Sequence, residues 1–246
     1  MAKAATIPTR EQVSLGNPSF VWRAGQDRRL HLIRRYVELE GTRVLDVGCG
    51  IGTYVGKLGE LAERAYGIDV DPKRVREGKT GSLAAAVSES LPFPDGAFDV
   101  VLLNEVIEHV RDDRATLVEA CRVVRPGGHV VVYAPNRLYP FETHGVYLGK
   151  RYVFGNIPFV NYLPDVLRRR LVPHARVYTR GGIRRLVEGL PARVVVHTQV
   201  YPGFDNIAAR SETFGRLLRG VCYRLESTAL RAFGLSHFLV LKVSDG

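Results

Sequence analysis

The sequence predicts an α/β protein with a doubly wound, mostly parallel seven-stranded sheet and an insertion after the fifth strand. Strand-like and helix-like segments alternate across residues 41–135, the order that builds a parallel sheet covered by helices. The run "AFDVVLLN" at residues 97–104 is apolar over most of its length, as expected for a strand buried on both faces. A turn rich in glycine follows the first strand, where open parallel sheets bind their ligands.

Each element has its own signal in the sequence. Leu30, Ile33 and Val37 recur at helical spacing and predict a helix over residues 27–40. Asp71 can cap a helix whose first turn holds Pro72, since proline is favoured there. Short apolar runs predict strands at residues 43–48, 64–70, 82–87, 97–104, 129–135, 192–200 and 236–243. Helical patterns predict further helices at residues 52–61, 112–124 and 181–190, and within 211–233.

The regular alternation stops after residue 135. Residues 136–180 hold four prolines and many aromatic residues, so we expect a substrate-binding insertion or lid there. Residues 1–40 are expected to form an N-terminal arm and a helix. Residues 41–246 are expected to form one α/β domain that contains the insertion.

Composition and length fit an ordinary soluble protein. The 246 residues are 46% hydrophobic and 24% charged, close to average globular usage. The three cysteines are far apart and form no CxxC pair, which argues against a disulfide framework or a structural zinc site. The sequence shows no signal peptide and no apolar run of ~18 residues. We therefore expect a cytoplasmic protein, with peripheral membrane association left open.

The formal net charge of +10 favours anionic partners. Basic residues gather between residues 137 and 185, a surplus that would suit nucleic acid, an anionic lipid surface or an acidic substrate. An arginine-rich solvated surface explains the same charge equally well. The charge alone does not decide between these alternatives.

The stretch "RVLDVGCGIG" at residues 43–52 places Asp46 two residues before the glycine-rich turn. A dinucleotide-binding turn would have a third glycine where this chain has Thr53, and would place a pyrophosphate at the helix N-terminus. Asp46 would repel that dianion and attract a cationic ligand. S-adenosyl-L-methionine carries such charges on its sulfonium and its α-ammonium group. Asp69, at the end of the next strand, can accept the hydroxyl groups of a ribose.

Four segments resemble the motifs of class I S-adenosylmethionine-dependent methyltransferases of the type 11 kind. In the family's order they are "VLDVGCGIG", "GIDVDP", "LPFPDGAFDVVLLNEVIEHV" and "RVVRPGGHVVVYAPN", all within residues 40–137. The resemblance implies a Rossmann-like methyltransferase fold for residues 41–246. It also implies S-adenosyl-L-methionine as the cofactor and methyl transfer as the activity.

The resemblance further implies which residues hold the cofactor. They are Asp46, Gly48, Cys49, Gly50 and Gly52 around the methionine part, Asp69 at the ribose, Val70, Ser88 and Glu89 at the adenine, and Asn104 near the ammonium group. Relatives often bond the adenine amine with an aspartate where this chain has Val87, so adenine recognition would depend on Ser88 or on the backbone. Gly52 could instead serve only helix packing, and Cys49 could contribute only its backbone.

Two clusters of acids and histidines could assist methyl transfer to a hydroxyl group, which needs a base. The first is Glu105, Glu108 and His109 in "NEVIEHV", expected at a helix start. It is similar to an E-x-x-E-H pattern of ubiquinone-pathway O-methyltransferases, where these residues are implicated in divalent-metal binding. Because many relatives with other acceptors share the pattern, we expect a structural role, with His109 bonded to backbone, and assign no metal ligand. In the second cluster, "PNRLYPFETHG", His144 could act as the base or could pin the lid together with Glu142.

We take His144, Glu142 and His109 as the candidate catalytic residues. For the acceptor, aromatic residues and arginines at 147–180 could line a channel for a large apolar molecule or contact anionic lipid. An apolar stripe with interleaved arginines within 211–233 could lie on a membrane, although packing on the core explains it as well. We expect a small-molecule or lipid-linked acceptor methylated at oxygen. The alternatives are an RNA methyltransferase, disfavoured because the chain has no recognisable RNA-binding module, and a non-catalytic domain that binds the cofactor or a membrane.

Overall fold

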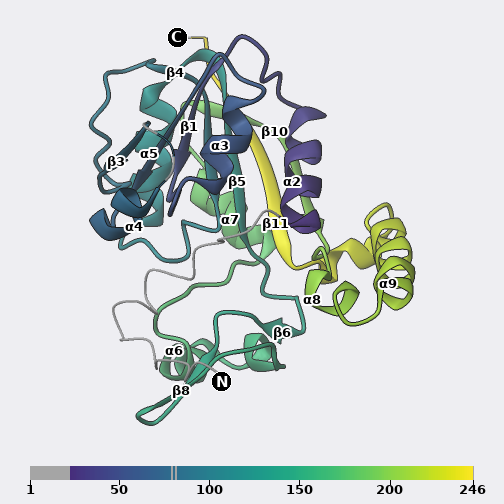
Figure 1. Ribbon diagram of the computed structural model, residues 1–246. Coiled ribbons are helices and arrows are strands. Elements are labelled where there is room, and N and C mark those ends of the chain that lie inside the picture. Colours follow the sequence, from purple (N-terminus) through teal and green to yellow (C-terminus); the bar gives the residue numbers. More distant parts are fainter. Residues whose placement is uncertain (1–22, 79, 81, 246) are drawn as a thin grey trace.

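A seven-stranded sheet forms the centre of the computed structural model, which describes residues 23–78, 80 and 82–245 (Figure 1). Its strands are β1 (Arg43–Val47), β2 (Arg64–Asp69), β3 (Leu83–Ala85), β4 (Phe98–Asn104), β5 (Val124–Pro135), β10 (Ala192–Val200) and β11 (Ser236–Val243). Their order is β10-β11-β5-β4-β1-β2-β3, and of these seven strands only β11 runs antiparallel to its neighbours. The predicted doubly wound, mostly parallel sheet is confirmed.

Helices cover both faces of this sheet. They are α2 (Ala24–Arg34), α3 (Thr53–Gly59), α4 (Pro72–Glu77), α5 (Asp113–Val123) and α7 (Arg180–Val187). Side chains of β4 alternate between two hydrophobic cores: Val101 and Leu103 pack with α5 and α7, whereas Val100 and Leu102 pack with α2 and α3. This alternation explains why the strand is apolar at successive positions.

Helix ends follow the signals in the sequence, with some shifts. Asp71 caps α4, because its carboxylate accepts a backbone N–H of the first turn at 2.9 Å. Helix α2 lies earlier than the predicted 27–40, and Val37 is buried in the turn that follows it. Strand β5 begins at Val124, earlier than predicted, because Val124 already pairs with β4. The predicted arm at residues 1–22 lies outside the described residues.

Residues 136–179 lie between β5 and α7 and form a small layer below the sheet in Figure 1. Backbone hydrogen bonds from Arg176 to Glu108 and from Tyr178 to Pro135 join this layer to the carboxyl edge of the sheet. Its elements are β6 (Phe141–Glu142), β7 (Val146–Leu148), β8 (Arg151–Val153), β9 (Ile157–Pro158), the 3-10 helix η1 (Val160–Tyr162) and α6 (Asp165–Leu171). The layer has a small apolar core of its own, formed by Val146, Val160, Val172 and Ala175.

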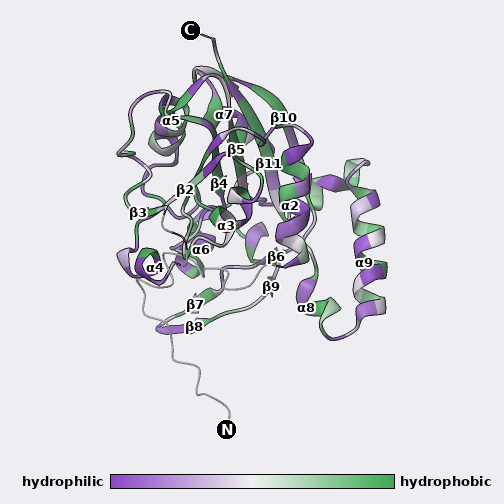
Figure 2. Cartoon of the chain, turned by 45° about the horizontal axis from the view of Figure 1, so that its top comes forward, coloured by the Kyte–Doolittle hydropathy of each residue, from purple (hydrophilic) through white to green (hydrophobic). Residues whose placement is uncertain are grey.

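A helical segment separates β10 from β11. It holds α8 (Asp205–Ala208), α9 (Glu212–Leu225) and the 3-10 helix η2 (Ala229–Phe233). Helix α9 packs on α8 and η2 and projects from the side of the sheet, at the right of Figure 1. Its residues Phe214, Leu217 and Val221 are exposed, and the hydropathy colours of Figure 2 mark apolar and polar positions along it. None of the helices formed by the described residues is both long and apolar enough to cross a membrane.

Candidate active site

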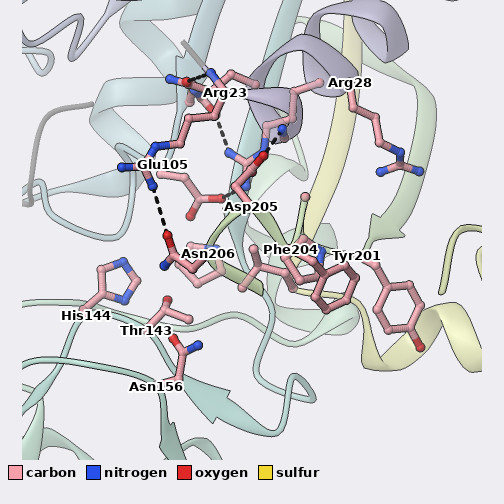
Figure 3. A pocket seen from close by; sticks show the side chains of 18 of the residues that line it. Arg23, Arg28, Glu105, Thr143, His144, Asn156, Tyr201, Phe204, Asp205 and Asn206 are labelled. Atoms are coloured by element: carbon pink, nitrogen blue, oxygen red, sulfur yellow. Dashed lines mark hydrogen bonds and ion pairs between the residues drawn. The ribbon is translucent and has the colours of Figure 1, made fainter. Parts of the chain in front are cut away.

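A cavity of about 860 Å³ lies beyond the carboxyl ends of β1, β4 and β5 (Figure 3). Its walls come from the glycine-rich turn after β1, from α2, from the insertion and from the segment around α8. Open parallel sheets bind ligands where their strand order reverses, which is here between β1 and β4. Ligand pockets usually measure about 300–1,000 Å³, so this cavity is at the upper end of that range.

The glycine-rich turn has a backbone that glycine adopts most readily. Gly48, Gly50 and Gly52 have φ angles of 73°, 58° and 82°, in the left-handed region. A Cβ atom on Gly48 would lie 2.6 Å from Val106 Cγ2, so a side chain there would also collide with the turn that follows β4. Gly48, Cys49 and Gly50 line the cavity, whereas Gly52 precedes α3 outside the lining.

Asp46 presents a buried carboxylate to the cavity near the end of β1. Burial raises the pKa of Asp46 well above its ordinary value, and the charge of Asp69 raises it further. A buried carboxylate is costly unless a positive charge or hydrogen-bond donors compensate it. A cationic ligand in the cavity would supply that compensation, and a pyrophosphate would not.

Asp69 ends β2 and is held by two backbone donors. Its Oδ2 atom accepts from the Gly50 N–H at 2.8 Å, and its Oδ1 atom accepts from the Asp71 N–H at 2.9 Å. These bonds tie the carboxylate to the glycine-rich turn. Asp69 is itself buried, and its neighbour Val70 is half exposed; both lie outside the cavity lining.

Ser88 and Glu89 lie in the loop between β3 and β4. The Ser88 hydroxyl lies 3.0 Å from the Thr116 hydroxyl and donates to Glu89 Oε2 at 3.1 Å. Glu89 Oε1 accepts from the Arg111 N–H at 2.9 Å. Both side chains therefore stabilise the turn that leads into α5, and neither of them lines the cavity.

Arg29 of α2 reaches into the cavity beside Asn104, and the motifs do not identify it. Its guanidinium donates to Asn104 Oδ1 at 2.6 Å and to Glu105 Oε1 at 2.7 Å. It also lies over the Tyr133 ring, 4.6 Å from the centroid. The signal that could have identified Arg29 is its place four residues before the buried Ile33, on one helix face, where a charge needs a partner.

The segment after β4 is not the predicted helix start. Residues 105–111 form turns and bends, and α5 begins only at Asp113. Glu105 has a φ of 57°, which is uncommon for a residue other than glycine. This backbone conformation is incompatible with a helix, and the Glu105 side chain lies beside α2 and Ser236. The Ser236 hydroxyl donates to the Glu105 carboxylate at 2.6 Å. Glu108 instead faces the insertion.

Glu108, His109 and His144 meet at the cavity wall opposite α2. Glu108 Oε1 lies 3.9 Å from His109 Nε2 and 3.8 Å from His144 Nε2. Glu142 is buried behind His144, with its Oε1 atom 2.9 Å from His144 Nδ1 and its Oε2 atom accepting from Arg168 at 2.5 Å. His109 and His144 line the cavity, and Glu142 does not. The structure thus brings the three candidate catalytic residues together.

Burial and neighbouring charges shift the pKa values of the side chains in this cluster. Burial would lower the pKa of His144, but the carboxylates of Glu108 and Glu142 outweigh it and raise the pKa to about 10. Burial raises the pKa of Glu108 to about 8. Burial, with the nearby charge of His144, lowers the pKa of His109 to about 4. These shifts favour a proton on His144, which lies between the carboxylates of Glu108 and Glu142.

Comparison with known proteins agrees with these features over part of the chain. Residues 45–132 match a family model described as a methyltransferase domain. A ubiquinone biosynthesis O-methyltransferase of Ralstonia nicotianae is 36% identical over 140 residues, which cover 53% of this chain and 58% of that protein. A probable S-adenosylmethionine-dependent methyltransferase of Mycolicibacterium smegmatis is 36% identical over 107 residues, 40% of each chain. The chain thus spans about half the length of these relatives.

Solved structures share the fold over most of the chain. An S-adenosylmethionine-dependent methyltransferase from Mesorhizobium loti has a TM-score of 0.60 at 18% identity, covering 89% of this chain and 98% of that one. The [4+2]-cyclase SpnF has a TM-score of 0.58 at 17% identity, covering 92% and 84%. At these identities the likeness shows the fold alone, and a cyclase shares it. Residues 45–132 are thus similar to a methyltransferase domain, and the whole fold is similar to that of S-adenosylmethionine-dependent methyltransferases.

Proposed function

We propose that this chain transfers the methyl group of S-adenosyl-L-methionine to a hydroxyl group of a small-molecule or lipid-linked acceptor. One observation carries the proposal: a single cavity joins Asp46 and the glycine-rich turn to the wall that holds His109 and His144. The first end suits the cofactor, and the second suits the acceptor. Figure 3 shows His144, Thr143 and Asn156 on one side of this space, opposite Arg23 and Glu105.

Asp46 is the group that favours this cofactor over a dinucleotide. The sulfonium and ammonium groups would compensate its buried carboxylate, whereas a pyrophosphate would add like charge. Asp69 is held at the end of β2 by the N–H of Gly50, and we assign its remaining acceptor sites to ribose hydroxyls. We place the adenine beside Val70, and we assign Ser88 and Glu89 to shaping the loop around it.

Methyl transfer needs little covalent help from the protein. The leaving sulfonium is already activated, so the site must align the acceptor with the methyl carbon and exclude water. An acceptor hydroxyl must in addition lose its proton. His109 and His144 are the histidines that line the acceptor side of the cavity formed by the described residues, and the Nε2 atom of each lies toward Glu108.

Apolar walls favour a lipophilic acceptor. Tyr139, Phe141, Tyr152 and Phe154 of the insertion line one part of the cavity, and Phe204, Ile207 and Leu218 of the α8–α9 segment line another. Leu218 lies on α9, which also exposes Phe214, Leu217 and Val221. Arg216 and Arg224 lie on the same helix. An apolar face flanked by cations suits an anionic membrane surface, from which a lipid-linked acceptor could reach the cavity.

The direct test uses S-adenosyl-L-methionine with a labelled methyl group. Purified chain is incubated with this cofactor and, separately, with a lipid extract, an aqueous metabolite extract and total RNA. We expect label in the lipid or aqueous metabolite fraction, in a bond that behaves as a methyl ether or ester. Label in RNA would mean that the acceptor is RNA rather than a small molecule or lipid. Binding of the cofactor without transfer to any fraction would favour a non-catalytic domain.

A further inference from the structure

Two polar side chains of the insertion face the cavity with their hydrogen-bonding groups unused. Thr143 and Asn156 both line the cavity, and neither side chain is hydrogen-bonded to another of the described residues. A threonine hydroxyl and an asparagine amide each offer both donors and acceptors. The pair can therefore bind ligand groups that donate and accept at the same time, as hydroxyl groups do.

The backbone of the insertion holds these two side chains opposite each other. Strands β6 and β9 are antiparallel, and Glu142 of β6 pairs with Ile157 of β9. The next pair in this register is Thr143 and Asn156, at the end of the ladder. Because side chains alternate between the two faces of a strand, Thr143 shares the cavity face with Phe141, whereas Glu142 is buried on the other face. The polar pair is thus a fixed part of the cavity wall.

Aromatic rings flank the polar pair. Phe141 and Phe154 line the cavity, and the two residues remain 38% and 63% exposed. Each precedes one member of the pair, Thr143 or Asn156, by two positions. The face of an aromatic ring carries partial negative charge, which attracts the slightly positive C–H groups on the apolar face of a sugar ring. Aromatic faces beside neutral hydrogen-bonding groups suit a ligand that has both C–H faces and hydroxyl groups.

A third neutral amide comes from a different element. Asn206 of α8 accepts from Arg23 through Oδ1 at 3.5 Å, which leaves its amide nitrogen as a donor toward a ligand. Asn206 also lines the cavity, and Figure 3 shows it above Thr143 and Asn156. A molecule between the insertion and α8 would therefore meet neutral polar groups on two sides.

Most charged side chains of the cavity lining already have partners. The pairs are Arg28 with Glu226, Arg29 with Glu105, Arg74 with Asp71 and Asp205 with Arg219. Asp46 is the carboxylate that we assign to the cofactor. An acidic or a cationic acceptor would have to compete with these pairs, whereas an uncharged acceptor needs none of them. The acceptor end of the cavity therefore favours an uncharged molecule with several hydroxyl groups.

We propose that the acceptor hydroxyl belongs to a neutral sugar ring. Hydrogen bonds from Thr143, Asn156 and Asn206 hold its hydroxyl groups, and its C–H face stacks on Phe141 and Phe154. The inference rests on the proposed function and narrows its acceptor, since a sugar can be the head group of a lipid-linked molecule.

Methyl transfer to a sugar hydroxyl is balanced within this site. The sugar oxygen bonds to the methyl carbon as the bond between that carbon and sulfur breaks. The electron pair of the broken bond stays on sulfur, and the hydroxyl proton passes to an imidazole of the acceptor wall. A planar phenol would stack on the same rings but would leave most of the amide groups without partners.

Saturation-transfer NMR with small sugars tests the binding site. The chain is first saturated with S-adenosyl-L-homocysteine, which occupies the cofactor end. It is then mixed separately with methyl glycosides of glucose, galactose, mannose and rhamnose, with glucuronate, and with phenol. We expect the ring protons of one or more neutral glycosides to receive saturation, and glucuronate and phenol to receive less.

Variants of the polar pair show where the sugar binds. Asn156→Ala and Thr143→Val should each weaken the affinity for the glycoside about fivefold, as expected for the loss of one hydrogen bond. Thr143→Ser should retain it. Thr213→Val, at an exposed residue of α9 outside the cavity lining, is the matched control. Unchanged affinity for S-adenosyl-L-homocysteine shows that each variant is folded.

The labelled product of the transfer assay tests the same inference chemically. Acid hydrolysis breaks glycosidic bonds but not methyl ethers, so the label should appear in an O-methyl monosaccharide. Label in a phenolic ether or in a carboxylate ester would keep the proposed function and overturn the sugar acceptor. Failure of the wild-type chain to bind any neutral glycoside, or equal binding by folded Asn156→Ala and Thr143→Val variants, would also overturn it. Glycoside binding without methyl transfer would support the sugar site and contradict the proposed function.

Discussion

Asp46 and Asp69 stand at the ends of adjacent parallel strands, and the charge of Asp69 adds to burial in raising the pKa of Asp46. Both carboxylates are buried beside the glycine-rich turn, but they differ in the hydrogen bonds that they accept from the backbone. Asp69 accepts two N–H groups, from Gly50 and Asp71. The site is therefore electrostatically incomplete at Asp46, and a cationic ligand would complete it.

The Asp46→Asn variant should stabilise the cofactor-free protein and weaken cofactor binding. It removes a buried charge next to Asp69, and each 1 kcal/mol gained raises Tm by about 2–4 °C in a chain of this size. Affinity for S-adenosyl-L-methionine should fall at least tenfold, about 1.4 kcal/mol. Calorimetry and thermal unfolding measure the two effects. Asp95→Asn, at a side chain that is 82% exposed, should change neither.

The stabilisation by Asp46→Asn should grow as the pH rises. The folded-state pKa of Asp46 lies above its unfolded value of about 3.9, so proton binding stabilises the folded wild type at low pH. That contribution is lost as the pH rises through the raised pKa, and asparagine has no such loss. Thermal unfolding of both proteins, without cofactor, measures the difference in Tm across this range. A difference that does not vary with pH would mean that Asp46 titrates normally.

Asp69→Ala should weaken S-adenosyl-L-methionine binding at least tenfold, about 1.4 kcal/mol, because ribose hydroxyls lose their acceptor. Asp71→Ala is the control, since Asp71 caps α4 through its own carboxylate. That control should cost about 1 kcal/mol of stability and leave affinity unchanged. Equal affinities for wild type and Asp69→Ala, measured by calorimetry, would remove Asp69 from the cofactor site.

Gly48→Ala should destabilise the fold more than Gly41→Ala. Both glycines have positive φ angles, 73° and 68°, so each alanine pays about 1–2 kcal/mol for the left-handed backbone. A Cβ atom on Gly48 would also collide with Val106 at 2.6 Å, whereas one on Gly41 would meet nothing within 4 Å. Urea unfolding compares the two. Equal costs would contradict the tight turn, and Val106→Ala in the Gly48→Ala background should restore part of the loss.

Leu217→Glu should reduce sedimentation with vesicles that contain anionic lipid. Leu217 is 63% exposed on α9 and would insert into the lipid interface, where a carboxylate is unfavourable and is repelled by the headgroups. We expect at least a threefold loss of bound protein. Val118→Glu, at an exposed apolar residue of α5, should bind like the wild type. Equal sedimentation of both variants would exclude α9 from membrane contact.

The sheet was predictable from the sequence because its signals are local. Alternating segments, the cap at Asp71 and the glycine-rich turn each lie within a few residues, and they predict the order of elements. The site depends on contacts that no local pattern contains. Arg29 meets Asn104 across 75 positions of the chain, and His144 reaches Glu108 from the insertion. The left-handed backbone of Glu105 similarly has no signal in "NEVIEHV", so a helix was predicted there wrongly.

Competitive calorimetry tests the central electrostatic claim most directly. The wild-type chain is titrated with S-adenosyl-L-methionine and with NAD, each alone and in the presence of the other. A single site that takes the sulfonium compound, ignores NAD and loses most of its affinity in Asp46→Asn is the result that the buried carboxylate predicts. Binding of NAD that the sulfonium compound cannot displace would contradict it.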